Sequence, residues 1–153
     1  MRIIYHCYGG AHSSVTAAAI HLGLLPLPTV SPEAIVSLPY FDEHSGKELG
    51  QLFYYGQDIH GNDVLILGCA RSANILKRTV RSALRLSSGD NDPLFINTLN
   101  GVNWCMRIGG FLSRRLGWTL VGRPLVTKGT LRALPRLTAL VTEALEEHVN
   151  LLF

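Results

Sequence analysis

The sequence has few charged residues and no long hydrophobic run. Only 16% of its 153 residues are Asp, Glu, Lys or Arg, and the formal net charge is +3. This small excess argues against a nucleic-acid partner, because nucleic-acid-binding proteins have strongly basic surfaces. Hydrophobic residues make up 47% of the chain, which is typical of a folded protein with a sizeable core. We expect one domain spanning 1–153.

Cysteine is also scarce. Cys7, Cys69 and Cys105 are widely spaced and form no CxxC pair, which excludes a zinc ribbon and a disulfide framework. Reduced thiols fit a cytoplasmic protein. The apolar run after Arg2 is too short for a signal peptide, and no run is long enough to cross a membrane. We therefore expect a cytoplasmic chain with no membrane partner.

Strand-like runs alternate with helical periodicity. The predicted strands are 2–8, 51–58, 63–69, 93–99 and 118–126, the second and third forming a hairpin. The predicted helices are 13–25, a short one beginning at Pro32 after Ser31, 71–86, 101–117 and 130–148, with Pro135 in the first turns of the last. This order predicts a single three-layer α/β domain, with helices on both faces of a mostly parallel sheet that the hairpin makes mixed.

The stretch YHCYGGAHSS joins the first strand to the first helix. Gly9 and Gly10 permit close approach of the backbone, and the amides at the start of the helix favour an anion. Ser13 and Ser14 offer hydroxyl donors, and His12 is the candidate catalytic residue for proton transfer. We expect this turn to bind phosphate or another anion. In the alternative, the glycines only make a tight turn and Ser13 or Ser14 caps the helix.

Two further loops are expected at the same edge of the sheet, where ligands of α/β proteins bind. NTLNGVN contains Asn100, and VTKGT contains Lys128. We expect Asn100 and Lys128 to line the wall opposite the turn, with Lys128 supplying a positive charge. In the alternative, Gly129 makes a turn, Thr130 caps the last helix and Lys128 is solvated.

The turn departs from two known phosphate-binding patterns. A P-loop, GxxxxGK[ST], requires Lys where this chain has His12, which argues against metal-nucleotide hydrolysis. The phosphatase loop, HCxxGxxR[ST], shares Cys7 and Gly10 with this chain, but its Arg is replaced by Ser13. Without that Arg, Cys7 is interpreted as a thiol at the end of a strand.

No metal site is predicted, because His6 and Cys7 are neighbours on a strand and point to opposite faces. The arginines of the 71–86 helix are typical of a solvated helix face, since no aromatics are interleaved with them. SLPYFD, residues 37–42, is interpreted either as a lid or partner surface over the turn, or as simple packing of Tyr40 and Phe41.

Four stretches resemble one family: GGAHSSVTAAAIHLG, SLPYFD, GGFLSRRLG and GRPLVTKGTL. Together they are similar to an uncharacterised Firmicutes family known as domain of unknown function number 3189, and the resemblance covers nearly the whole chain. It implies a small cytoplasmic bacterial protein from an endospore-forming lineage. The resemblance implies no particular activity and gives no catalytic role to Cys7.

The expected function is therefore binding of a phosphate-bearing or other small anionic ligand at the turn. If the chain is an enzyme, phosphoryl or acyl transfer is the expected reaction class, with His12 moving the proton. The alternative is a non-catalytic protein-interaction or regulatory module in a spore-forming bacterium. The sequence specifies no cofactor.

Overall fold

A computed structural model describes residues 1–43, 46–88, 92–115 and 119–150. Its sheet has four strands in the order β2-β3-β1-β4. The central strand β1 (Arg2–Cys7) runs parallel to β3 (Asp63–Gly68) and to β4 (Leu94–Asn97), and β2 (Leu52–Gln57) is antiparallel to β3. The predicted mixed, mostly parallel sheet and its hairpin are confirmed.

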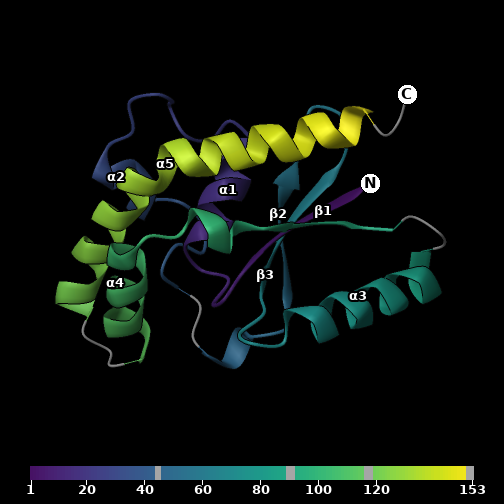
Figure 1. Ribbon diagram of the computed structural model, residues 1–153, viewed down its shortest axis with the longest axis horizontal. Coiled ribbons are helices and arrows are strands. Elements are labelled where there is room, and N and C mark those ends of the chain that lie inside the picture. Colours follow the sequence, from purple (N-terminus) through teal and green to yellow (C-terminus); the bar gives the residue numbers. More distant parts are fainter. Residues whose placement is uncertain (44–45, 89–91, 116–118, 151–153) are drawn as a thin grey trace.

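Helices cover both faces of the sheet (Figure 1). The side chains of Ile3 and Tyr5 in β1 point into a large core shared with α1 (Ser13–His21) and α5 (Thr119–Asn150). Ile4, the residue between them, belongs to a smaller core under α3 (Ala73–Ser88). Because successive side chains of a strand alternate between faces, a strand buried on both faces is mostly apolar, and His6 is a buried polar residue of β1. The predicted α/β architecture is therefore confirmed.

The first helix, α1, lies flat against the sheet because its sequence is rich in small residues. Val15 and the three alanines at 17–19 are fully buried. The helix ends after His21, and Gly23 follows in the left-handed conformation, with a φ of +66°. Its N-cap is His12, and no side chain caps it. The alternative in which Ser13 or Ser14 caps the helix is wrong, because both serines lie inside the helix and their hydroxyls bond elsewhere.

The second helix, α2 (Pro32–Val36), begins as predicted. The side chain of Ser31 accepts a hydrogen bond from the amide of Ala34 at 3.2 Å, and Pro32 occupies the first turn. The structure also has two short 3-10 helices. The first, η1 (Gly46–Glu48), precedes β2, and the second, η2 (Thr98–Gly101), follows β4 directly. The helix α4 (Trp104–Arg115) precedes α5, and its predicted end at Gly117 lies outside the described residues.

The predicted strand at 118–126 is wrong. From Thr119 onward this segment forms the first part of α5, a helix of 32 residues that also carries Pro124 and Pro135 in its interior. A short apolar run does not distinguish a buried strand from a buried helix. The expected turn at Gly129 and cap at Thr130 are wrong for the same reason, since the hydroxyl of Thr130 donates to the carbonyl of Val126 within the helix.

Glycines explain how closely this helical segment lies against α4, beside it in Figure 1. A Cβ atom on Gly109 would lie 2.5 Å from the amide nitrogen of Val126. A Cβ atom on Gly129 would lie 2.7 Å from that of Met106. Both glycines therefore allow the backbones of α4 and α5 to approach closely, whereas the sequence alternative interpreted Gly129 as a turn.

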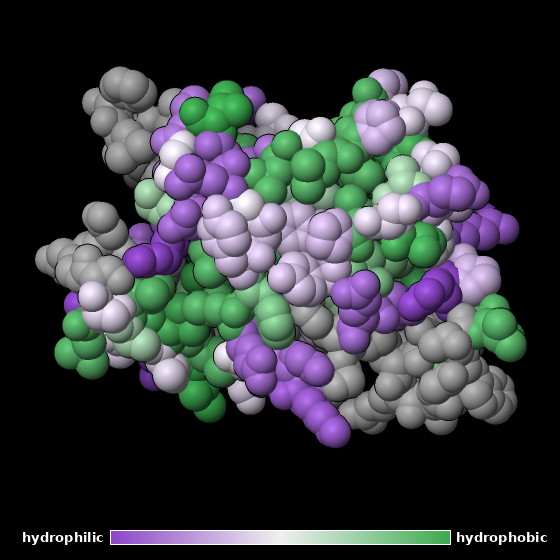
Figure 2. All heavy atoms as spheres, turned by 180° about the vertical axis from the view of Figure 1, so that it is seen from behind, coloured by the Kyte–Doolittle hydropathy of each residue, from purple (hydrophilic) through white to green (hydrophobic). Residues whose placement is uncertain are grey.

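Within the described residues, no helix combines the length and the apolar character that a membrane span requires. Apolar side chains nevertheless remain on the surface among hydrophilic ones, as the space-filling view from behind shows (Figure 2). Among the exposed apolar residues are Val36 in α2 and Leu120 in α5.

Candidate functional site

The turn between β1 and α1 lies at the carboxyl end of the central strand and packs tightly on β3. Gly10 has a φ of +70°, and a Cβ atom there would lie 2.7 Å from the amide nitrogen of Gly68. The amide of Ala70 donates to the carbonyl of Tyr8 at 2.8 Å. Only glycine fits this close approach in the left-handed conformation, so the structural role of Gly10 is clear.

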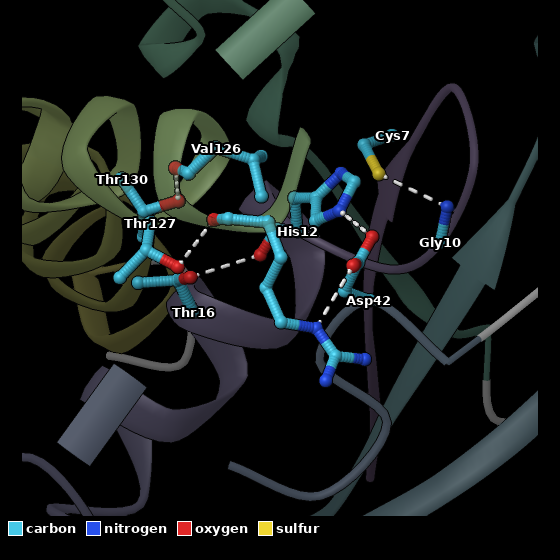
Figure 3. Close-up of polar contacts among 9 residues, drawn as sticks. Cys7, Gly10, His12, Thr16, Asp42, Val126, Thr127 and Thr130 are labelled. Atoms are coloured by element: carbon cyan, nitrogen blue, oxygen red, sulfur yellow. Dashed lines mark hydrogen bonds and ion pairs between the residues drawn. The ribbon is translucent and has the colours of Figure 1, made fainter. Parts of the chain in front are cut away.

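Cys7 ends β1 and points its sulfur into the turn (Figure 3). Its Sγ accepts the amide N–H of Gly10 at 3.1 Å and is hydrogen-bonded to Oγ of Ser14 at 3.2 Å. The residue is 5% exposed and lies at the N-terminal end of α1. Cys7 is the strand-end thiol that the sequence predicts, and its two hydrogen bonds are a feature that sequence reasoning missed. A thiolate accepts such bonds better than a thiol does.

Ser13 is also buried and joins α1 to η2. Its Oγ lies 2.9 Å from Oγ1 of Thr98, and that hydroxyl donates to the carbonyl of His6 at 3.1 Å. Asn100 is exposed on η2. The loop containing Asn100 thus packs against the start of α1, while the hydroxyls of both candidate serines contact protein groups.

The N-terminus of α1 is buried without a side-chain cap. Ser13 and Ser14 are 1% and 0% exposed. The amides of residues 13–15 have no acceptor within the part of the chain that the structure describes, and the first helical bond is donated by Thr16. Buried helix ends are normally satisfied by side chains, water or a ligand. This end presents several N–H donors and the positive end of the helix dipole.

His12 is held by a carboxylate that sequence reasoning missed. Its Nε2 donates to Oδ1 of Asp42 at 2.9 Å, and Nε of Arg123 donates to Oδ2 of the same carboxylate at 3.3 Å (Figure 3). The side chain of Asp42 is 0% exposed and that of His12 is 16% exposed. The only sequence signal for this group was a lone acidic residue closing SLPYFD.

The segment SLPYFD does lie over the turn. The amide of Asp42 donates to the carbonyl of Ala11 at 3.0 Å, and the ring of Phe41 meets the His12 ring edge-on at 5.4 Å between centroids. Tyr40 instead packs against Phe53 and Tyr55 of β2. On the other side of His12, the Cα of Gly110 in α4 comes so close that a Cβ atom would lie 3.0 Å from the ring. The ring is therefore fixed on several sides.

Lys128 does not lie in a loop after a strand, contrary to the sequence prediction. It is an exposed residue in the middle of α5 and lines a groove between α5 and α2. The cation that reaches the neighbourhood of the turn is Arg123, through Asp42. The helical course of the segment explains the difference, since Lys128 lies more than one turn along α5 from Arg123.

His6 points away from the turn, toward α3. It is 1% exposed, its ring meets that of Phe95 edge-on, and neither ring nitrogen has a hydrogen-bond partner within the described chain. Burial, and then the charge of Lys77, lower its pKa to about 4. His6 is thus neutral near pH 7. No group of three or more His, Cys, Asp or Glu side chains within the described residues is arranged to hold a metal ion.

A second buried hydrogen-bond network lies at the other end of α1. The hydroxyl of Tyr5 is 3.0 Å from Nδ1 of His21, whose Nε2 donates to Oδ2 of Asp58 at 3.1 Å. Burial lowers the pKa of His21, and the hydrogen bond to Asp58 opposes that change. Asp58 also accepts two hydrogen bonds from Asn62 in the hairpin turn. This hydrogen-bond network links α1 to the hairpin and is separate from the β1–α1 turn.

Comparisons with known proteins identify a family and nothing further. No curated protein and no solved structure matches the chain significantly. A family model described as "Protein of unknown function (DUF3189)" matches residues 2–146, which is nearly the whole sequence. The chain therefore belongs to the DUF3189 family.

Proposed function

We propose that the chain binds a small phosphate-bearing or other organic anion at the turn between β1 and α1. The observation that carries this proposal is the buried, uncapped N-terminus of α1, whose amides at residues 13–15 lack an acceptor within the described chain. An anion there would accept those N–H groups and interact favourably with the helix dipole. Gly9 leaves the backbone of the turn open to a close approach, since a Cβ atom there would have nothing within 4 Å.

In this proposal His12 is the group that moves a proton. Asp42 accepts from its Nε2, and the rings and backbone packed around it fix its orientation beside the start of α1. A histidine oriented by a carboxylate is a common general acid or base. Asn100, which is exposed on the neighbouring η2, would contact the outer part of the ligand.

A titration of thermal stability with phosphate, pyrophosphate and phosphate monoesters tests the binding. A ligand present at ten times its Kd raises the free energy of unfolding by about 1.4 kcal/mol. We expect such a rise for the wild type and a clearly smaller one for His12→Gln. His60→Gln is the matched control, because His60 is exposed in the hairpin turn. If no anion stabilises the wild type at millimolar concentration, the turn is not an anion site and a protein partner becomes the better hypothesis.

A second candidate function, phosphoryl transfer through Cys7, is favoured by the two hydrogen bonds that converge on its sulfur. The thiolate would attack the phosphorus of a monoester, forming an S–P bond as the P–O bond to the leaving group breaks. Protonated His12 would give its proton to the departing oxygen. Water would then attack phosphorus and lose a proton to His12, which releases phosphate and restores the thiolate.

Hydrolysis of p-nitrophenyl phosphate tests this step separately from binding. We expect slow hydrolysis by the wild type, none by Cys7→Ser, and a reduced rate for Ser14→Ala, which removes one hydrogen bond to the sulfur. Mass spectrometry of an acid-quenched reaction should find phosphate on Cys7. Equal hydrolysis by Cys7→Ser would overturn the covalent step, whereas phosphate binding without hydrolysis would leave the turn as a binding site alone.

A further inference from the structure

A groove of about 620 Å³ lies between α2 and the first half of α5, away from the catalytic candidates of the turn. Its walls are mostly apolar. Pro32 and Val36 line it from α2, and Leu120, Pro124 and Leu131 line it from α5. Leu120 and Pro124 are four residues apart and Leu131 follows seven residues later, so the three form a stripe on one face of α5.

Apolar residues on both walls of the groove are open to solvent. Leu120 is 92% exposed and Val36 is 40% exposed. Exposed apolar surface inside a concave site is typical of ligand-binding grooves, and the volume lies within the range of sites for small molecules. The groove therefore has the size and lining of a small-molecule site.

Two positive charges line the same groove. Arg123 uses its Nε atom for Asp42, and its two terminal nitrogens have no acceptor within the described residues. Lys128 has no carboxylate partner in that part of the chain either. Among the residues that the structure describes, none that lines the groove is acidic. Lys128 and the terminal nitrogens of Arg123, at the edge of an apolar groove, are complementary to an anion that carries an apolar body.

The length of the groove limits what can occupy it. The wall that α2 supplies is a helix of only five residues, about 7.5 Å long. A peptide helix docks through anchors spread over two or more turns, which is longer than this wall. A small molecule needs no such length.

We propose that this groove binds a small amphiphilic organic anion, with its apolar body between α2 and α5 and its charged group at Lys128 and Arg123. The proposal does not depend on an anion at the turn. The two sites share only Arg123, which reaches Asp42 from the wall of the groove.

Calorimetric titration with three probes tests the class of ligand. The probes are 2-naphthoate, which has both features, 2-naphthol, which is uncharged near neutral pH, and acetate, which lacks the apolar body. We expect 2-naphthoate to bind the wild type at least about tenfold more tightly than either of the other two, since only it satisfies both the cations and the apolar walls.

Two groove variants and two matched controls locate the site. Lys128→Gln should weaken 2-naphthoate roughly two- to fivefold and leave 2-naphthol unchanged. Leu120→Ser should weaken both naphthyl probes about fivefold. Arg136→Gln, on an exposed residue of α5 outside the groove, and Leu86→Ser, on a residue of α3 that is 90% exposed, should change neither.

The proposal is overturned if 2-naphthoate binds no better than acetate, or if neither groove variant changes its affinity. It is also overturned if the wild type forms a dimer that Leu120→Ser dissociates while 2-naphthoate does not bind. That result would assign the exposed stripe of α5 to contact between two copies of the chain.

Discussion

The imidazole of His12 and the carboxylate of Asp42 are joined at 2.9 Å, although 30 residues separate them in the sequence. This contact fastens the segment SLPYFD to the N-terminus of α1. Asp42 has a φ of +57°, a left-handed conformation that is uncommon for non-glycine residues. Its carboxylate is 0% exposed, so its negative charge depends on His12 and Arg123 for compensation.

We therefore expect His12→Ala to destabilise the fold by about 3 kcal/mol, because it removes a group that compensates a buried carboxylate. The double variant His12→Ala/Asp42→Ala should lose less than the sum of the two single losses, since the uncompensated charge is absent. Urea unfolding of all four proteins measures both quantities. Strict additivity would mean that the two side chains do not interact energetically.

The three cysteines should react at different rates in the folded protein. Cys69 is 2% exposed, and burial raises the pKa of its thiol to about 11. Because the thiolate is the reactive form, Cys69 should be the slowest to alkylate near pH 7.5, and the partly exposed Cys105 should react faster. Iodoacetamide labelling followed by peptide mass spectrometry gives each rate. In urea the three rates should converge, and a native Cys69 that reacts as fast as Cys105 would contradict the expectation.

Local patterns were enough to predict most of the sheet. The mostly apolar run of β1 and the turn residues between β2 and β3 specify strands without reference to the rest of the chain. Ser31 followed by Pro32 likewise specifies the start of α2, since the cap and the ring act within one turn. These predictions succeeded because the physical cause lies within a few residues.

The errors concern features that depend on distant partners. Gly129 lies inside α5, where the backbone of α4 leaves no room for a Cβ atom, and nothing near it in the sequence indicates that contact. Asp42 belongs to the candidate site only through His12 and Arg123, which come from α1's N-cap and α5. Because residues 119–126 are helical, Lys128 lies in the groove and not at the turn, where the sequence predicted it. Tertiary packing overrides local propensity at such positions.

The glycines between α4 and α5 give a prediction with an unusual sign. Replacing a helical Gly by Ala normally stabilises a helix by about 1 kcal/mol. Gly109→Ala and Gly129→Ala should instead destabilise the protein by roughly 2 kcal/mol each, because the new Cβ atom would lie under 3 Å from the backbone of the facing helix. Gly9→Ala is the control for stability, since a Cβ atom there has nothing within 4 Å. Denaturant midpoints of the three variants decide the point, and stabilisation by Gly109→Ala would mean that the helices lie farther apart.

The buried ring of His6 should make stability depend on pH. Its pKa is about 4 in the folded protein, whereas an exposed histidine titrates near 6.5, so the unfolded chain binds a proton that the folded one does not between these values. Stability is then complete above about pH 6.5 and falls as the pH is lowered toward 4, by an amount on the order of 3 kcal/mol. The lowered pKa of His21 acts in the same direction.

His6→Leu separates the contribution of His6 from that of His21. The ring nitrogens of His6 have no partner in the described chain, so an apolar side chain of similar size should cost little stability at pH 7. It should remove most of the loss between pH 6.5 and pH 4, because leucine has no proton to bind. Urea unfolding at pH 7, 5.5 and 4.5, with His60→Gln as the exposed-histidine control, measures the slopes. An unchanged slope in His6→Leu would show that the acid sensitivity comes from His21 or from the carboxylates, and that the ring of His6 is hydrated in the folded protein.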